Sequence, residues 1–212
     1  MSTYDLEEQE QLAALKAWWK EHGGAVMLGA ILVLAIFGAW NGWTWYQRSQ
    51  AAQAALLYES LQNAARANDL KATGEIAGNI LEKFPRTAYA PLAALISAKA
   101  QFQAGDRKTA QAQLEWVVEH ARNDGIRSIA RLRLASVLLD GNEYESALKV
   151  LDAKPEPSFE ALFISLRGDI FLAEKKLPEA RAAYKTALEK TQAGDGALRD
   201  ALRLKLDALG DS

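Results

Sequence analysis

The sequence predicts an all-α protein in which one transmembrane helix precedes a stack of helix pairs and a closing C-terminal helix. Three observations lead to this fold class. The first is a long segment near the N-terminus that contains no charged residue. The second is an Ala-rich helical periodicity from Ser49 onward, and the third is a set of turn signals at almost constant spacing. Proline is rare there and falls where helices break, at Pro85, Pro155 and Pro157.

The charge-free segment covers residues 23–47. As an α-helix it would be roughly 37 Å long, enough to cross a ~30 Å hydrocarbon core with some tilt. Trp18 and Trp19 precede it, and Trp40 and Trp43 are among the aromatic residues at its other end. Indole rings favour the headgroup layer because they combine an apolar face with a polar N–H group. We therefore expect a single transmembrane helix at these residues.

Two other interpretations fit this segment less well. A buried core helix rarely has so long an uninterrupted apolar run between two groups of tryptophans. A cleaved signal peptide needs a positively charged start and an apolar run of about 7–15 residues. Here the preceding residues are mainly acidic and the run is longer. An Ala-x-Ala sequence at residues 52–54 lies too far beyond the run for normal cleavage.

Residues 1–22 are expected to form a short cytoplasmic segment. Residues 4–21 have helical periodicity, with acidic residues early and lysines late, as the helix dipole favours. This part is expected either to lie at the membrane interface as an amphipathic helix or to be a loosely ordered polar tail. Lys16 and Lys20 precede the span, whereas only Arg48 follows it closely. The positive-inside rule therefore places the N-terminus in the cytoplasm and the large domain outside.

Small residues recur at four-residue spacing along the predicted membrane helix. The clearest pairs are Ala35 with Ala39 and Gly38 with Gly42. Small residues at this spacing let two helix backbones approach closely in a bilayer. We therefore expect these four residues to contact a second membrane helix, while membrane lipid surrounds the rest of the span.

The composition argues against several classes of function. The 212 residues include 25 Lys plus Arg and 27 Asp plus Glu, so the basic surplus of a nucleic-acid-binding protein is missing. The chain has no cysteine, which rules out disulfides, thiolate metal sites and cysteine nucleophiles. His22 and His120 are far apart in the sequence, and neither a phosphate-binding loop nor a nucleophile elbow occurs. We expect no catalytic, cofactor-binding or metal site, and no enzymatic activity.

The clearest repeating unit covers residues 161–192. It has Gly168, Ala180 and Ala187 at small-residue positions and Tyr184 at an aromatic position. This pattern resembles the tetratricopeptide repeat (TPR). In such repeats, small residues let two helices of a pair approach closely, and an aromatic ring fills the gap between them.

Weaker copies of this unit precede it, so a TPR α-solenoid is expected over residues 48–212. The turn signals inside four helix pairs are Asn68-Asp69, Gly105-Asp106, Gly141-Asn142 and Lys175-Lys176. The third pair is expected to be cut short by the Lys-Pro-Glu-Pro sequence at 154–157, and the link before it to be longer around Asn123. Residues 196–209 supply a last helix, with Asp195 as its N-cap, that closes the stack.

The whole layout resembles a bacterial membrane-protein family. The stretches YDLEEQEQLAALKAWWKEHG, ILEKFPRTAYAPLAAL and LRGDIFL are similar to those of the YfgM family, the ancillary subunit of the SecYEG translocon. This resemblance covers essentially the full chain and implies an inner-membrane protein whose repeat domain lies in the periplasm. It also implies association with the translocon and with a PpiD-type periplasmic chaperone. A part in handling unfolded exported polypeptides would follow.

TPR domains bind other proteins mainly with the concave face formed by the first helix of each pair. Carrying the concave positions over to this sequence gives a groove of mostly apolar residues. The predicted partner-binding residues are Leu92, Leu95, Lys99, Phe102, Ile129, Leu132, Leu139, Leu162, Asp169 and Leu172. Further residues at concave positions are Gln103, Ser136, Asp140, Ser165 and Ala173. An apolar groove suits an unfolded segment, because hydrophobic contact tolerates many sequences.

The groove is expected either to be open to a client or to be covered by the terminal helix or the segment after the membrane helix. If it is open, changing Leu95 and Leu132 to Asp should weaken binding and leave helicity intact. The favoured function is a membrane-tethered protein-binding module, accessory to the translocon and acting with periplasmic chaperones. The alternatives are a purely structural scaffold that clusters membrane complexes without clients, and an adaptor of inverted topology that faces the cytoplasm.

Overall fold

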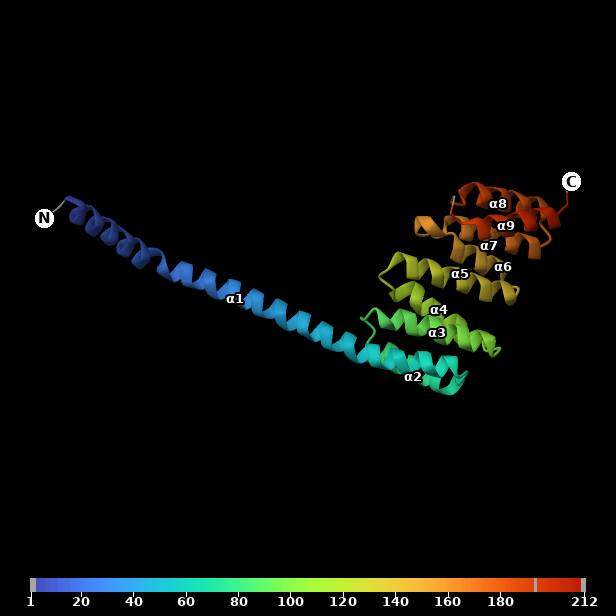
Figure 1. Ribbon diagram of the computed structural model, residues 1–212, viewed down its shortest axis with the longest axis horizontal. Helices are drawn as coiled ribbons and strands as arrows, with labels where there is room; N and C mark the ends of the chain where they lie inside the picture. The colour runs from blue at the N-terminus through green and yellow to red at the C-terminus, as the bar shows by residue number, and fades with distance from the viewer. Residues whose placement is uncertain (1–2, 193, 211–212) are drawn as a thin grey trace. The chain divides into compact units, whose positions relative to one another are not determined.

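The computed structural model describes residues 3–192 and 194–210, with the backbone alone at residues 3–9 and 30 (Figure 1). In these ranges the chain is helical and has no strand, so the all-α prediction is confirmed. The predicted segments 1–22 and 48–212 also include residues 1, 2, 193, 211 and 212, which lie outside the described residues. The helices are α1 Thr3–Arg66, α2 Leu70–Lys83, α3 Tyr89–Gln103, α4 Arg107–His120, α5 Asp124–Asp140, α6 Tyr144–Leu151, the 3-10 helix η1 Pro157–Phe159, α7 Glu160–Ala173, α8 Leu177–Lys190 and α9 Gly196–Ala208.

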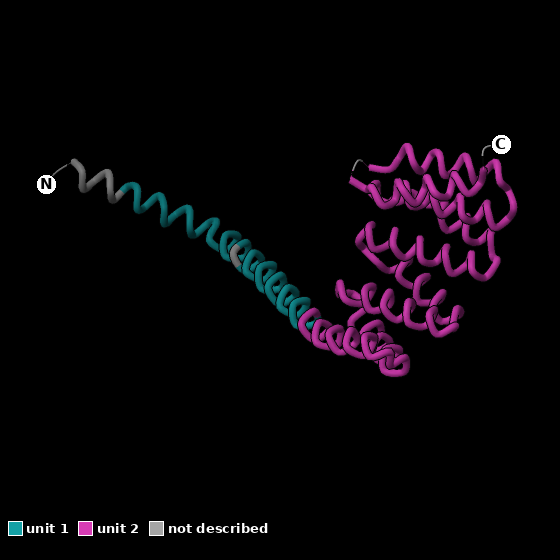
Figure 2. Tube along the Cα trace, turned by 45° about the vertical axis from the view of Figure 1, so that its right-hand side comes forward, with its two compact units in different colours: residues 1–50 teal, residues 51–212 magenta. Residues whose placement is uncertain are grey.

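The chain divides into two compact units, Met1–Gln50 and Ala51–Ser212 (Figure 2). The described part of the first unit is helical throughout, and its apolar side chains face outward. Those of Leu28 and Leu34, for example, are 70 % and 69 % exposed. Among the residues that the structure describes, one helix is long and apolar enough to cross a membrane, and it contains this segment. Large exposed apolar surfaces are rare on soluble monomers, so the first unit fits a single-pass membrane protein.

The second unit is a stack of helix pairs. The end of α1 packs with α2, α3 with α4, α5 with α6 and α7 with α8, and α9 follows as a last single helix (Figure 1). First helices of neighbouring pairs also touch, α3 with α5 and α5 with α7. In the described residues, these contacts run from each pair to the next, which is the architecture of an α-solenoid with a C-terminal capping helix.

A residue in the left-handed conformation ends the first helix of every pair. These residues are Asn68, Gly105, Asn142 and Lys175, with φ of 55°, 88°, 61° and 63°, and they lie 37, 37 and 33 residues apart. Each donates its N–H to the carbonyl three residues earlier, and the next N–H bonds to the carbonyl five residues before it. This is the Schellman motif, which satisfies carbonyl groups that a helix end leaves free. The predicted turn signals are confirmed as the bends inside the helix pairs.

Aspartates start the second helix in the first two pairs. The Asp69 carboxylate accepts from the Ala72 N–H at 2.9 Å, and the Asp106 carboxylate accepts from the Thr109 N–H at 3.0 Å. Hydrogen bonds from the side chain and backbone of Thr109 hold the pKa of the Asp106 carboxyl below its ordinary value. The predicted N-cap of α9 is only partly confirmed. Asp195 precedes that helix, but its side chain makes no cap hydrogen bond.

Helices pack closely where small residues recur, as predicted for residues 161–192. Ala180 and Ala187 are fully buried, and so is the Tyr184 ring. A Cβ atom at Gly168 would lie 2.6 Å from Cδ1 of Tyr184 and nearer still to Cε1. Only glycine fits there, because any larger residue would displace the ring.

The third pair departs from the others in length. Its second helix, α6, has 8 residues, against 14 in α4 and in α8, because Pro155 and Pro157 follow it as predicted. The longer link expected before this pair is instead helical. Asn123 caps α5 by accepting from the Ile126 N–H at 2.9 Å, so the additional residues join the helix.

Three buried clusters follow one another along the second unit. The first joins the end of α1 to α2 and α3 through residues such as Leu61 and Ile80. The second and largest covers α3 to α7, and Trp116 packs against both. The third joins α8 to α9, with Tyr184 and Leu202 fully buried. Trp116 therefore lies between helices of neighbouring pairs.

Gly168→Ala is expected to destabilise the protein by about 1–3 kcal/mol, because the new methyl group overlaps the Tyr184 ring. The measurement is urea unfolding of the full chain in detergent, followed by far-UV circular dichroism. The control is Gly78→Ala in α2, where nothing lies within 4 Å of the new Cβ. Its higher helix propensity should stabilise the chain by about 0.5–1 kcal/mol. Equal effects of the two substitutions would contradict the close packing at Gly168.

Candidate protein-binding groove

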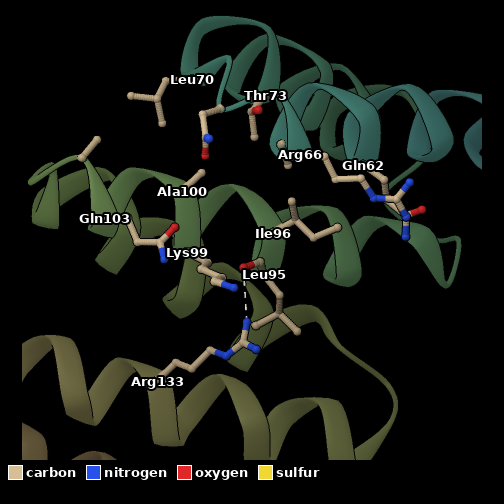
Figure 3. Close-up of a pocket in the computed structure, with 13 residues that line it drawn as sticks. Gln62, Arg66, Leu70, Thr73, Leu95, Ile96, Lys99, Ala100, Gln103 and Arg133 are labelled. Atoms are coloured by element: carbon tan, nitrogen blue, oxygen red, sulfur yellow. Dashed lines mark hydrogen bonds between the residues drawn. The ribbon is translucent and has the colours of Figure 1, made fainter.

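A pocket of about 570 Å³ opens at the N-terminal end of the second unit. We name it the N-terminal pocket. Its lining comes from the end of α1, the α1–α2 turn, the start of α2, and α3 and α5 (Figure 3). Three residues predicted for the concave face, Leu95, Lys99 and Gln103, lie together in it. The volume is within the ~300–1,000 Å³ range of small-ligand sites.

Helical spacing places the α3 residues in this pocket. Leu95, Lys99 and Gln103 are four residues apart, so their side chains share one face of the helix. Ile96 and Ala100 lie next to them and add apolar surface. Leu95 is only 6 % exposed, so the floor of the pocket is continuous with the core.

The charges in the N-terminal pocket have one sign. Arg66 from α1, Lys99 from α3 and Arg133 from α5 line it, and no acidic residue of the described chain does. Figure 3 shows Lys99 extending from α3 toward α5, while Arg133 reaches from α5 back to α3. The Arg133 guanidinium donates to the Leu95 carbonyl at 3.3 Å. The pocket therefore has an apolar floor and a positively charged rim.

The other predicted groove residues of α3 and α5 do not line the pocket. They are partly buried: Leu92, Phe102, Ile129, Leu132 and Leu139. The last four pack against the largest core cluster, so the two helices do not form one open apolar trough. The Leu95 side chain is buried, and an unpaired carboxylate there is strongly unfavourable, so Leu95→Asp would disturb the packing as well as the groove.

At the other end of the stack, α9 covers part of the predicted groove. The Asp169 carboxylate accepts from Lys205 Nζ at 2.7 and 2.9 Å and from the Tyr184 hydroxyl at 2.7 Å. Lys205 Nζ also lies 5.3 Å from the centre of the Tyr184 ring. Burial, together with the bond to Asp169 and its charge, raises the pKa of Tyr184 well above its ordinary value.

The groove is therefore neither fully open nor fully covered. Leu162 and Leu172 on α7 stay 38 % and 40 % exposed, whereas Asp169 between them is bound to α9. The terminal helix closes this end, and the segment after the membrane helix forms a wall of the N-terminal pocket.

The predicted contact face of the membrane helix is exposed. A Cβ atom at Gly38 or Gly42 would meet nothing within 4 Å outside the local backbone of its own helix. Ala35 and Ala39 are exposed on the same face. The face is therefore free to contact a second helix.

Three charged residues at the groove are among those missing from the sequence prediction: Arg66, Arg133 and Lys205. The repeat spacing could have identified Arg66. The turns at Asn68 and Gly105 are 37 residues apart, and Arg66 lies 37 residues before Gln103, so it occupies the equivalent concave position one repeat earlier. Arg133 directly follows a concave position but is not one itself. It reaches the pocket because α5 packs beside α3, which no pattern within a repeat specifies.

Comparison with known proteins establishes the family of the chain. Residues 16–211 match the family described as tetratricopeptide repeat-like domain. An ancillary SecYEG translocon subunit of Neisseria gonorrhoeae is 35 % identical over 211 residues, which cover 96 % of this chain and 98 % of that protein. The chain belongs to the YfgM family. Ancillary SecYEG translocon subunits of Haemophilus influenzae and Escherichia coli are 29 % and 27 % identical, over 97 % and 95 % of this chain and 99 % and 96 % of theirs.

The YfgM family is non-enzymatic, so the groove is not a catalytic site. The histidine of the second unit has a packing role. His120 stacks on Trp116 with 4.6 Å between ring centres, and its Nδ1 lies 2.9 Å from the Trp116 carbonyl.

Lys205→Met is expected to loosen α9, because Asp169 loses the ammonium group that covers it. The side chains of the pair are 36 % and 30 % exposed, so we expect a loss of about 1 kcal/mol at most. Amide hydrogen exchange over residues 196–208, measured by mass spectrometry, should accelerate. The control is Arg203→Met, whose ion pair with Asp200 is exposed and stays within α9. Unchanged protection in the Lys205 variant would show that this ion pair does not hold the helix.

Proposed function

We propose that this protein is a single-pass subunit of the bacterial inner membrane that assists the SecYEG translocon. Residues 23–47 would anchor it, residues 1–22 would lie in the cytoplasm, and residues 48–212 would form a periplasmic TPR-like domain. The names of its relatives and the exposed apolar helix support this role. The excess of Lys16 and Lys20 over Arg48 supports the orientation.

We propose further that the periplasmic domain binds unfolded exported polypeptides and works with a PpiD-type periplasmic chaperone. The N-terminal pocket carries this proposal. Its apolar floor can hold a side chain of an extended segment without requiring one sequence, and its polar rim remains accessible. Because α1, α3 and α5 all contribute, a segment in the pocket would contact three repeats at once.

A second candidate function is a structural scaffold that clusters inner-membrane complexes and binds no client. The ion pair between Lys205 and Asp169 favours this alternative, since it closes one end of the groove. Burial of Leu132 and its neighbours against the core also favours it, because a scaffold needs no long open trough.

The membrane helix would supply a contact of its own. We propose that Ala35, Gly38, Ala39 and Gly42 pack against a helix of the translocon or of the tethered chaperone. Their small side chains allow close backbone approach, and lipid would cover the other faces of the helix.

Single cysteines are expected to report the orientation, because the chain has none of its own. Lys185→Cys should react with a membrane-impermeant maleimide in intact spheroplasts, since α8 would lie in the periplasm. Gln11→Cys should react only after lysis, since it would lie in the cytoplasm. Both positions are exposed, so accessibility within the protein does not decide the result. Labelling in the opposite pattern would establish the inverted topology.

A photoreactive residue at Gln103 is expected to crosslink to polypeptides in the course of export, because this position lines the N-terminal pocket. The measurement uses intact membranes that export a radiolabelled secretory protein. The control is the same photoreactive residue at Lys185, which is exposed and does not line the pocket. Crosslinks from Gln103 to a constant membrane partner alone, whether or not export is active, would favour the scaffold.

A further inference from the structure

We infer that the N-terminal pocket selects acidic segments, in which Asp or Glu side chains alternate with apolar ones along an extended polypeptide. The inference rests on the proposed protein-binding function and adds the chemistry of the ligand. Three features carry it: the cations of the rim, the absence of acidic side chains from the described lining, and the amide side chains that also line the pocket.

Two of the three cations have no partner in the described part of the chain. Arg66 and Lys99 form neither an ion pair nor a side-chain hydrogen bond there. Arg133 donates to one backbone carbonyl, that of Leu95, so most of its five N–H groups remain available. The rim therefore offers unpaired positive charge on three different helices.

Three acidic residues near the pocket have partners of their own. The Asp69 carboxylate caps the start of α2. Glu75 lies 3.9 Å from Lys71 in an exposed ion pair, and Asp140 lies 3.2 Å from Arg107. None of these carboxylates lines the pocket. No acidic side chain of the described residues lines the site, so an entering anion would meet positive charge that is not neutralised there.

The remaining polar groups suit a polypeptide better than a lipid headgroup. Gln62, Asn68 and Gln103 line the pocket, and each carboxamide offers both donors and an acceptor. An extended backbone presents N–H and C=O groups in alternation and can pair with both kinds of atom. A phosphate diester provides acceptors only, so it could pair with the amide N–H groups but not with the amide oxygens. The apolar floor at Leu95 and Ile96 accepts the side chains between the acidic ones.

The inference is tested with the full chain in phosphatidylcholine nanodiscs and fluorescent peptides whose ends are blocked. One peptide alternates Glu with Leu, and its matched partner has Gln in place of every Glu. We expect the acidic peptide to bind at least about tenfold more tightly, with an affinity that falls as salt is added. The double variant Arg66→Gln with Lys99→Gln should remove this preference, so that the Glu and Gln peptides bind with equal affinity.

The matched control is Lys185→Gln with Arg122→Gln, which removes the same charge from exposed residues outside the pocket. It should keep the preference for the acidic peptide. Equal binding of both peptides to the unmodified protein would overturn the inference and leave the proposed function standing. Failure of both peptides to bind would overturn the inference and the groove together.

A second experiment tests whether the cations of the pocket bind lipid headgroups instead of polypeptides. Phosphatidylglycerol vesicles are offered to the same nanodisc-embedded proteins. If the double variant loses binding to these vesicles but keeps the peptide preference of the unmodified protein, the cations serve lipid headgroups and the inference is overturned. If vesicle binding is the same for the double variant and its control while the peptide preference is lost, the inference is supported.

Discussion

The close approach of helices in each pair is the constraint on which the second unit depends. Alanines occupy the contact positions and are at most 1 % exposed at residues 98, 110, 135, 147, 180 and 187. At Gly168 even a methyl group would overlap the Tyr184 ring. Such short side chains allow two backbones to pack along their length, so each pair forms a thin layer that can stack on the next.

The N-terminal pocket is a product of this stacking and of the 37-residue spacing. Gln62 and Arg66 stand in the same places relative to the Asn68 turn as Lys99 and Gln103 do relative to the Gly105 turn. The end of α1 and α3, which are the first helices of two successive pairs, therefore place equivalent residues in the same pocket. Helix α5 adds Arg133. No single repeat holds the site, because its lining comes from α1, α2, α3 and α5.

Much of the fold follows from local sequence, whereas the groove depends on how repeats are offset. The turn at Asn142 and the short α6 are specified by residues within a few positions, through the Schellman motif and the prolines. A repeat pattern predicts the face of the helix on which Leu95 lies. It does not predict how far neighbouring helices cover that face, so the burial of the Leu95 side chain was not predictable. Lys205 reaches Asp169 across 36 residues of sequence, and no spacing rule connects them.

The position of Trp116 has a spectroscopic consequence. The other five tryptophans of the chain all lie at or before residue 45, so this indole is the single one of the second unit. It packs at the junction of the first two buried clusters and against His120. If the five tryptophans of the first unit were replaced by phenylalanine, the tryptophan fluorescence of the protein would come from Trp116 at this junction alone. Its wavelength and quenching would then follow any separation of the first repeats from the rest of the stack.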